Sequence, residues 1–242
     1  MRTVAIIQAR MGSSRLPGKV LADIHGDTML GRVVSRLRAA RTIDEVVIAT
    51  SVLADDDAIV TEATRLGCGS HRGSETDVLD RYLGAARAYN ADAIVRVTAD
   101  CPLLDAGVVD LVVSALVRDV DYASNTHTRT FPRGLDVEAM HRDTLERIGR
   151  LGTSESAREH VTAFVMERPE LFRVRQVVAV DDASLLRWTV DTSDDLALVR
   201  TLYALYEPDA VSYRKLVEIV RSRPELRSFN AHVIQKPWNH VA

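Results

Sequence analysis

Apolar runs alternate with amphipathic stretches along the first half of the chain. Short apolar runs between polar residues predict buried strands at 3–8, 45–50, 68–71, 93–97 and 121–124. Apolar residues at helical spacing predict helices at about 28–40, 55–66, 77–89 and 104–117. Strands that alternate with helices in this way indicate the α/β class, with a mostly parallel central sheet flanked by helices.

The regular alternation breaks over 125–138, a polar and basic stretch that has no helical period. A loop of this length is usually functional or disordered. Beyond it the pattern predicts helices at 142–151, 154–167, 196–206 and 213–223, and strands at 172–180 and 187–191. The short stretch 20–24 is expected to be extended. The tail from 231, with Pro237 and Trp238, is uninformative.

Composition excludes several classes of protein. The chain has 242 residues, 46% hydrophobic and 27% charged, which suits a single α/β domain with at most a small insertion. A net charge of −3 provides no basic field for nucleic acid. Cys68 and Cys101 are too few and too far apart for a zinc site or a disulfide framework, so reduced thiols in the cytoplasm are expected. The sequence has neither a membrane-length apolar run nor a secretory pattern.

The stretch that follows the first strand, residues 9–19, is the most informative. It contains two glycines and three cations, Arg10, Arg15 and Lys19. Glycine allows close backbone approach, and successive N–H groups in such a loop can hold an anion. The spacing fits neither a Walker A loop nor G-x-G-x-x-G. We interpret the loop as a cradle for a triphosphate; the alternative is a solvated loop with surface cations.

Two aspartates follow predicted strands. Asp100 comes after the strand at 93–97 and before Pro102, and Asp191 ends the strand predicted at 187–191. Mg²⁺ prefers one or two carboxylates together with phosphates and water. Asp100 and Asp191 are therefore predicted metal ligands; a loop-capping Asp100 and a helix-capping Asp191 are the alternatives. The run of three aspartates at 55–57 is interpreted as a helix N-terminus rather than a metal site.

Five stretches of the chain resemble the sugar cytidylyltransferases, which include the 3-deoxy-manno-octulosonate and acylneuraminate cytidylyltransferases. The branch of spore coat polysaccharide biosynthesis protein F is the most similar. The stretches are Ile-Ile-Gln-Ala-Arg-Met-Gly-Ser-Ser-Arg-Leu-Pro-Gly-Lys at 6–19, Arg-Val-Thr-Ala-Asp-Cys-Pro-Leu at 96–103, Pro-x-Gly-Leu-Asp-x-Glu at 132–138, Arg-Glu-His-Val-Thr at 158–162 and Val-Asp-Thr at 190–192.

The resemblance implies one Rossmann-like nucleotidyltransferase domain over 1–242, with an acceptor and dimerisation region at about 125–180. It implies Mg²⁺-dependent transfer of CMP from CTP to a small anionic acceptor, a sugar acid or a group such as a phosphonate, with release of pyrophosphate. A homodimer is also implied. No nucleic acid or membrane partner is expected.

The resemblance also assigns roles to residues. The catalytic set is Lys19, Arg10, Arg15 and Asp100. The nucleotide-binding set is Gln8, Ala9, Arg10, Met11, Gly12, Ser13, Ser14, Arg15, Lys19, Arg72, Gly73, Ser74, Thr98 and Ala99. The acceptor-binding set is His127, Arg129, Arg133, Asp136, Glu138 and His160. For the acceptor set, a lid or dimer-contact loop with satisfied charges is an equal alternative, and either Asp136 or Glu138 could assist the metal instead.

Three other functions stay open on the sequence alone. The first is a nucleotidyltransferase that uses a different NTP. The second is a nucleotide-sugar glycosyltransferase of similar fold, although such enzymes usually carry a D-x-D motif and this chain has Asp100-Cys101-Pro102. The third is a nucleotide-binding protein without catalysis, which the two carboxylates and Lys19 argue against.

Overall fold

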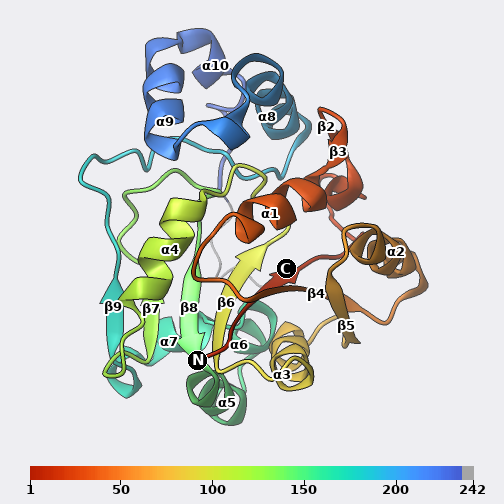
Figure 1. Cartoon of the computed structure of the whole chain (residues 1–242), viewed down its shortest axis with the longest axis vertical. Coiled ribbons are helices and arrows are strands. Elements are labelled where there is room, and N and C mark those ends of the chain that lie inside the picture. Colours follow the sequence, from red (N-terminus) through yellow and green to blue (C-terminus); the bar gives the residue numbers. More distant parts are fainter. Residues whose placement is uncertain (236–242) are drawn as a thin grey trace.

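The computed structural model describes residues 1–235 and has one central sheet between helices (Figure 1). Seven strands follow the order β5-β4-β1-β6-β8-β7-β9. Their bounds are β1 Thr3–Gln8, β4 Glu45–Ser51, β5 Gly69–Gly73, β6 Ala93–Thr98, β7 Tyr122–Ser124, β8 Glu138–His141 and β9 Val174–Gln176. A separate two-stranded ribbon joins β2 (Asp23–Ile24) to β3 (Asp27–Thr28).

The sheet is parallel except at one strand. β1 pairs in parallel with β4 and β6, β4 with β5, and β7 with β9. β8 runs antiparallel to both of its neighbours, β6 and β7. The predicted α/β class with a mostly parallel central sheet is confirmed. The carboxyl ends of the parallel strands therefore share one edge, where such sheets bind ligands.

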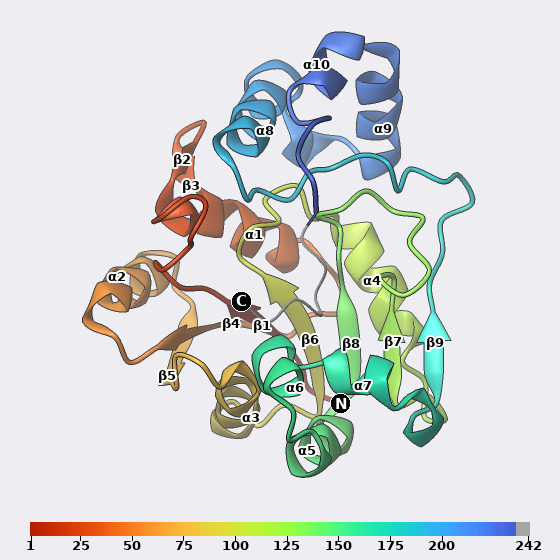
Figure 2. The same cartoon turned by 180° about the vertical axis from the view of Figure 1, so that it is seen from behind.

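Helices cover both faces of the sheet, as Figures 1 and 2 show from opposite sides. The α-helices are α1 Met29–Arg38, α2 Asp57–Arg65, α3 Val78–Ala88, α4 Ala106–Ala115, α5 Arg142–Leu151, α6 Glu155–His160, α7 Ala163–Glu167, α8 Ser193–Tyr206, α9 Tyr213–Ser222 and α10 Pro224–Ser228. The 3₁₀ helices are η1 Lys19–Leu21, η2 Ala54–Asp56, η3 Pro169–Leu171 and η4 Pro208–Ala210.

Two hydrophobic cores lie on opposite faces of the sheet, and β1 supplies residues to both. Ala5 and Ile7 point into the core that includes α1, α4 and α8, whereas Val4 and Ile6 point into the core that includes α3 and α5. Successive side chains of a strand alternate between faces. Strands covered on both faces read as continuous apolar runs, which explains the pattern of the central strands.

Four predicted elements differ in the structure. The helix predicted at 154–167 is interrupted at Val161, whose φ of 57° and ψ of −65° form a tight γ-turn between α6 and α7. The strand predicted at 172–180 contracts to β9, and the stretch 20–24 is partly the 3₁₀ helix η1. The predicted strand at 187–191 is wrong: the only ladder contact described there is an isolated bridge between Arg133 and Arg187.

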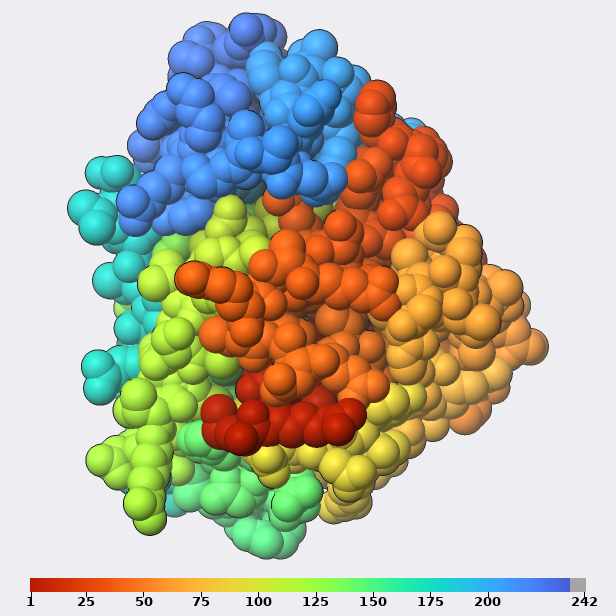
Figure 3. All heavy atoms as spheres, viewed as in Figure 1, coloured from red at the N-terminus to blue at the C-terminus, as the bar shows by residue number. Residues whose placement is uncertain are grey.

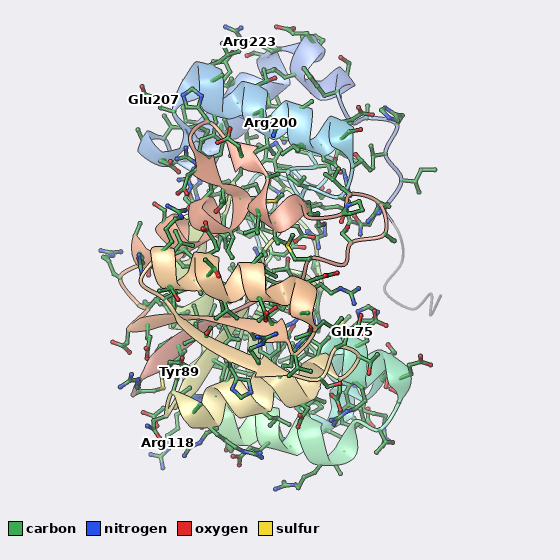
Figure 4. The ribbon with its side chains drawn as sticks, turned by 90° about the vertical axis from the view of Figure 1, so that its right-hand side faces the viewer. Glu75, Tyr89, Arg118, Arg200, Glu207 and Arg223 are labelled. Carbon is green, nitrogen blue, oxygen red and sulfur yellow. The ribbon has the colours of Figure 1, made fainter. Side chains whose placement is uncertain are left out.

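The C-terminal helices pack against early parts of the chain. In Figure 3 the segments of the C-terminal region (blue) lie directly against those of the first forty residues (orange). In Figure 4 Arg200, Glu207 and Arg223 mark this end of the molecule, and Tyr89 and Arg118, which follow α3 and α4, lie at the opposite end. Among residues 1–235, no helix has the length and apolar character needed to cross a membrane. Pro237 and Trp238 lie outside the described residues.

Gly134 controls how the chain approaches the sheet edge near Asp191. Its φ is +101°, and a Cβ there would lie 2.5 Å from the Thr189 nitrogen and 2.6 Å from the Trp188 carbonyl carbon. Both amide groups donate to the Arg133 carbonyl oxygen, at 2.7 Å from Trp188 and 3.1 Å from Thr189. Only a residue without a side chain allows this contact between backbone segments.

We predict that Gly134→Ala lowers the free energy of unfolding by about 2 kcal/mol or more, because neither the backbone conformation nor the contact tolerates a Cβ. Urea denaturation measures the change. Gly12→Ala is the matched control, since a Cβ at Gly12 meets no atom within 4 Å. Equal stabilities for the two variants would show that the chain accommodates a side chain at Gly134.

Candidate active site

The loop that follows β1 curls back over residues 9–18. The N–H groups of Ser13 and Gly18 both donate to the Met11 carbonyl oxygen, at 2.9 and 3.0 Å. Gly18 has a φ of 69°, a left-handed conformation that glycine adopts without steric penalty. The chain then enters η1, which turns the Lys19 side chain inward, so that Lys19 is buried.

Asp56 anchors this loop from the start of α2. Its carboxylate accepts the Met11 N–H at 2.7 Å and the Ser51 N–H at 3.1 Å, and the Ser51 hydroxyl donates to it as well. Burial works to raise the pKa of Asp56, but these hydrogen bonds outweigh it and lower the pKa overall. The Asp56 side chain makes no cap hydrogen bond at the start of α2. The aspartates at 55–57 were expected to act at this helix N-terminus, but Asp56 holds the opening loop instead.

A pocket of about 260 Å³ opens beside the loop, at the carboxyl ends of β1 and β6. Most residues of the predicted nucleotide-binding set line it, together with both predicted metal ligands. The lining residues are Gln8, Ala9, Arg10, Gly12, Ser13, Ser14, Arg15, Lys19, Val20, Thr98, Ala99, Asp100 and Asp191. Val20 was not selected from the sequence, and Met11, Arg72, Gly73 and Ser74 do not line this pocket.

Lys19 joins the two predicted metal ligands. Its ammonium group donates to Asp100 Oδ2 at 3.0 Å, to Asp191 Oδ1 at 2.9 Å and to the Val190 carbonyl oxygen at 2.6 Å. Burial works to lower the pKa of Lys19, but Asp100 and Asp191 outweigh it and raise the pKa. Lys19 therefore stays protonated and places a positive charge at the base of the pocket.

Asp191 reaches the pocket without belonging to a strand of the sheet. The Val190 N–H donates to the Asp100 carbonyl oxygen at 2.8 Å, which ties the segment to the loop after β6. Arg15 and Arg187 contact Asp191 Oδ2 at 2.9 and 2.7 Å. Burial works to raise the pKa of Asp191, but the three neighbouring cations outweigh it, with Lys19 the largest contributor, and lower the pKa.

Arg187 positions Asp191 and was not selected from the sequence. It is buried, and its guanidinium contacts Asp195 Oδ1 through Nε at 2.9 Å and Oδ2 through Nη2 at 3.2 Å. Asp195 also accepts the Asp191 N–H, and with Thr192 it forms a capping box at the start of α8. The only available signal was the position of Arg187 inside the stretch that contains Asp191.

Asp100 lies at the sheet edge two residues after β6. Its Oδ1 accepts the Thr98 hydroxyl at 2.5 Å, and its Oδ2 accepts Lys19. Cys101 beside it is buried, and burial raises the pKa of this thiol well above its ordinary value. Such a thiol is a poor nucleophile, so the site contains two carboxylates and cations but no activated nucleophile near Asp100.

Arg72 stabilises the turn before α2 through hydrogen bonds. Its guanidinium donates to the carbonyl oxygens of Ser51 and Leu53 at 3.0 and 2.9 Å, and it contacts Asp57 at 2.5 Å. Gly73 lies so close to Arg81 that a Cβ there would be 2.8 Å from Arg81 Cγ. These contacts shape the loop after β5 that the resemblance places beside the base.

None of the predicted acceptor residues lines the pocket. Arg129 forms a two-bond ion pair with Asp136, at 2.5 and 3.0 Å. His127 packs its ring against Tyr122, and burial lowers its pKa. Arg133 is half-buried, and His160 ends α6 beside the γ-turn.

Glu138 forms the centre of a buried polar network. Arg96 and the Tyr122 hydroxyl both donate to its carboxylate, and the Thr162 hydroxyl donates at 2.6 Å. Burial works to raise the pKa of Glu138, but Arg96 and these donors outweigh it and lower the pKa. Arg96 also donates to Gln8 Oε1 at 3.1 Å, which links this network to the wall of the pocket. Arg96 is a further residue that the sequence analysis missed.

At this sheet edge a glycine-containing basic loop follows β1, and two carboxylates lie opposite it. This is the arrangement of a nucleotidyltransferase. The chain matches the cytidylyltransferase family over residues 4–219. It is 34% identical to spore coat polysaccharide biosynthesis protein SpsF of Bacillus subtilis, an alignment that covers 91% of this chain and 94% of that one. It is also 34% identical to a 3-deoxy-manno-octulosonate cytidylyltransferase of Anaeromyxobacter sp., over 61% of this chain and 58% of that one.

Among solved structures, a cytidylyltransferase from Leptospira borgpetersenii superimposes with a TM-score of 0.89 at 34% identity, over 93% of this chain and 96% of that one. The chain belongs to the cytidylyltransferase family, and it is a CTP-dependent nucleotidyltransferase. The resemblance found in the sequence is thus confirmed. The roles of individual residues stay predictions.

We predict that Asp56→Asn lowers the free energy of unfolding at pH 7 by about 2 kcal/mol, because an amide nitrogen would face the buried donors of Ser51. The folded-state pKa of Asp56 is depressed, so its stabilisation is present above about pH 4 and is lost as the pH falls through the folded-state pKa. The difference from wild type should therefore shrink at low pH.

Urea denaturation at several pH values measures this effect. Asp57→Asn is the control, because the Asp57 carboxylate is 65% exposed and, in the described part of the chain, its one ion pair is with Arg72. We expect that control to change stability by less than about 1 kcal/mol. A difference for Asp56→Asn that stayed constant down to pH 3 would contradict the ionised carboxylate as the source of the stabilisation.

Proposed function

We propose that the protein transfers CMP from CTP to a small anionic acceptor, with Mg²⁺ as cofactor and pyrophosphate as product. The observation that carries this proposal is the pocket in which the loop 9–18, Lys19 and two carboxylates meet at one sheet edge. Membership of the cytidylyltransferase family supports CTP as the donor.

The loop and its cations suit the triphosphate. Gly12, Ser13 and Ser14 line the pocket, and Arg10 and Arg15 line the same space. An anion held by backbone amides and guanidinium groups is a common phosphate site in α/β proteins. We assign the β and γ phosphates to this wall of the pocket.

The residues opposite the loop fit a divalent cation. Asp100 Oδ2, Asp191 Oδ1 and the Val190 carbonyl oxygen already surround a positive charge, the ammonium group of Lys19. Oxygen ligands of this kind, completed by phosphates and water, are those that Mg²⁺ prefers. Asp100 and Asp191 would hold the metal, which when bound neutralises charge that develops on the phosphates.

The chain's own residues act by position and charge. A deprotonated acceptor oxygen forms a bond to the α-phosphorus while the bond from that phosphorus to the pyrophosphate oxygen breaks. Arg10, Arg15 and Lys19 stabilise the negative charge that moves onto the departing pyrophosphate. The buried, protonated Cys101 has no part in this displacement, and direct attack by the acceptor requires no covalent enzyme intermediate.

We propose a sugar acid as the acceptor. Arg133 supports an anionic group: it is half-buried, and within residues 1–235 it has no ion pair with a carboxylate. The name of the Anaeromyxobacter relative specifies an octulosonate, a sugar acid. Residues 125–180 contain Arg133 and His127 and are proposed to choose the acceptor; a phosphonate would present similar negative charge.

Nucleotide binding provides the first test. We expect CTP with Mg²⁺ to raise the melting temperature more than UTP, ATP or GTP, because a ligand of the native state stabilises it. Pyrophosphate release is then followed with a panel of sugar acids and phosphonates. Selective stabilisation by another nucleotide would overturn the choice of CTP, and no response to any nucleotide would favour a protein without catalysis.

Asp100→Asn is the matched variant for that assay. It preserves the size of the side chain but removes a negative charge, so we expect turnover to fall by about a hundredfold or more while the protein still folds, because Asp191 keeps its contact with Lys19. Turnover at the wild-type level would exclude Asp100 as a metal ligand.

We propose a cytoplasmic homodimer as the working form. Cys68 and Cys101 are both free thiols, which suits a reducing compartment. The resemblance assigns the dimer contact to about 125–180. Light scattering should therefore give twice the chain mass of 26.8 kDa, and a single-chain mass at working concentrations would contradict the dimer.

A further inference from the structure

The ammonium group of Lys19 has no N–H left for a phosphate. An ammonium group offers three donors, and its three acceptors are Asp100 Oδ2, Asp191 Oδ1 and the Val190 carbonyl oxygen. The side chain of Lys19 is only 10% exposed. For Lys19 to contact the terminal phosphates of CTP, at least one of these three bonds must break.

The same three oxygens are those assigned above to the divalent cation. They lie 2.6 to 3.0 Å from the Lys19 nitrogen, whereas Mg²⁺ requires oxygen ligands at about 2.1 Å. The two cations cannot occupy this position together. Binding of the metal there requires the ammonium group to leave.

The charges around this position are already balanced. Lys19, Arg15 and Arg187 are positive, and they contact Asp100, Asp191 and Asp195, which are negative. A divalent cation that entered alone would leave two uncompensated positive charges in a largely buried cluster, which is costly. A triphosphate brings several negative charges and offers acceptors to Lys19 and Arg15 in the adjoining pocket.

We propose that Lys19 occupies the metal position in the nucleotide-free enzyme and leaves it only when a triphosphate accepts its ammonium group. The metal then takes the place between Asp100 and Asp191. Metal binding at this position is thus conditional on the nucleotide, and by reciprocity the metal strengthens nucleotide binding. The inference rests on the proposed function, because it takes Asp100 and Asp191 as the metal ligands.

Mn²⁺ is the probe, because electron paramagnetic resonance measures free Mn²⁺ directly without any turnover. Without nucleotide, we expect wild type and Asp100→Asn to leave the same amount of Mn²⁺ free. With CTP present, wild type should retain more Mn²⁺ than Asp100→Asn. More retention by wild type than by Asp100→Asn in the absence of CTP would overturn the proposal, and so would equal retention in its presence.

Lys19→Met removes the ammonium group but leaves a side chain of similar length. We expect it to bind Mn²⁺ without nucleotide about tenfold or more tightly than wild type. The double variant with Asp100→Asn should lose that gain, which would locate the bound ion. If Lys19→Met does not fold, the comparison of wild type with Asp100→Asn still tests whether the metal binds at this position only with nucleotide.

Arg15→Met is the matched control, because it removes a positive charge from the same carboxylate of Asp191 without emptying the position of Lys19. We expect it to gain much less Mn²⁺ affinity than Lys19→Met. Equal gains would show that net charge, rather than occupancy, controls metal binding, and would overturn the proposal. Thermal stabilisation of wild type by CTP is measured separately, so failure of the proposed function is distinguished from failure of this inference.

Discussion

The contact of the Lys19 ammonium group with Asp100 and Asp191 holds the site together. It joins three parts of the chain that are distant in sequence: the loop after β1, the end of β6 and the segment before α8. Buried opposite charges of this kind need hydrogen bonds on every side to offset their desolvation. Here Arg187, Thr98 and the Val190 carbonyl oxygen supply them. The pocket depends on this contact because the loop and both carboxylates line it.

Two further buried acids set the position of the pocket walls. Asp56 holds the backbone of the opening loop at Met11, and Glu138 holds Arg96, which in turn contacts Gln8 at the end of β1. Neither carboxylate lines the pocket. Both have depressed pKa values in spite of burial, which shows that their donors more than compensate for lost water. The walls are thus held by charge-assisted hydrogen bonds as well as by apolar packing.

The sequence was sufficient for the α/β class, for the central parallel strands and for most residues that line the pocket, but it did not predict β8. Strands buried on both faces have an unmistakable apolar pattern, and the loop after β1 combines glycine with cations in one short stretch. It was insufficient for the way in which Asp191 is held: the residue was selected as a metal ligand, but it reaches the pocket on backbone hydrogen bonds to the loop after β6 and not on a strand. The roles of Asp56 and Arg96 could not be predicted either, because their partners are distant in sequence and no local sequence pattern indicates these contacts.

The acceptor side differs physically from the nucleotide side. Arg129 and Asp136 satisfy each other, and Glu138 is fully enclosed by its donors, so these charges stabilise the loop 125–138 itself. The difference is one of position: Lys19 and Arg15 line the open pocket although both contact Asp191, whereas Arg129 does not line it. Under the proposed function, the acceptor is recognised either after that loop rearranges or by a cation that has no carboxylate partner among residues 1–235, such as Arg133. Apart from Gly134, the loop can vary in sequence without disturbing Lys19, Asp100 or Asp191, because within residues 1–235 none of their side-chain hydrogen bonds involves a side chain of this loop. Under the proposed function, a change of acceptor through this loop would therefore leave the nucleotide site intact.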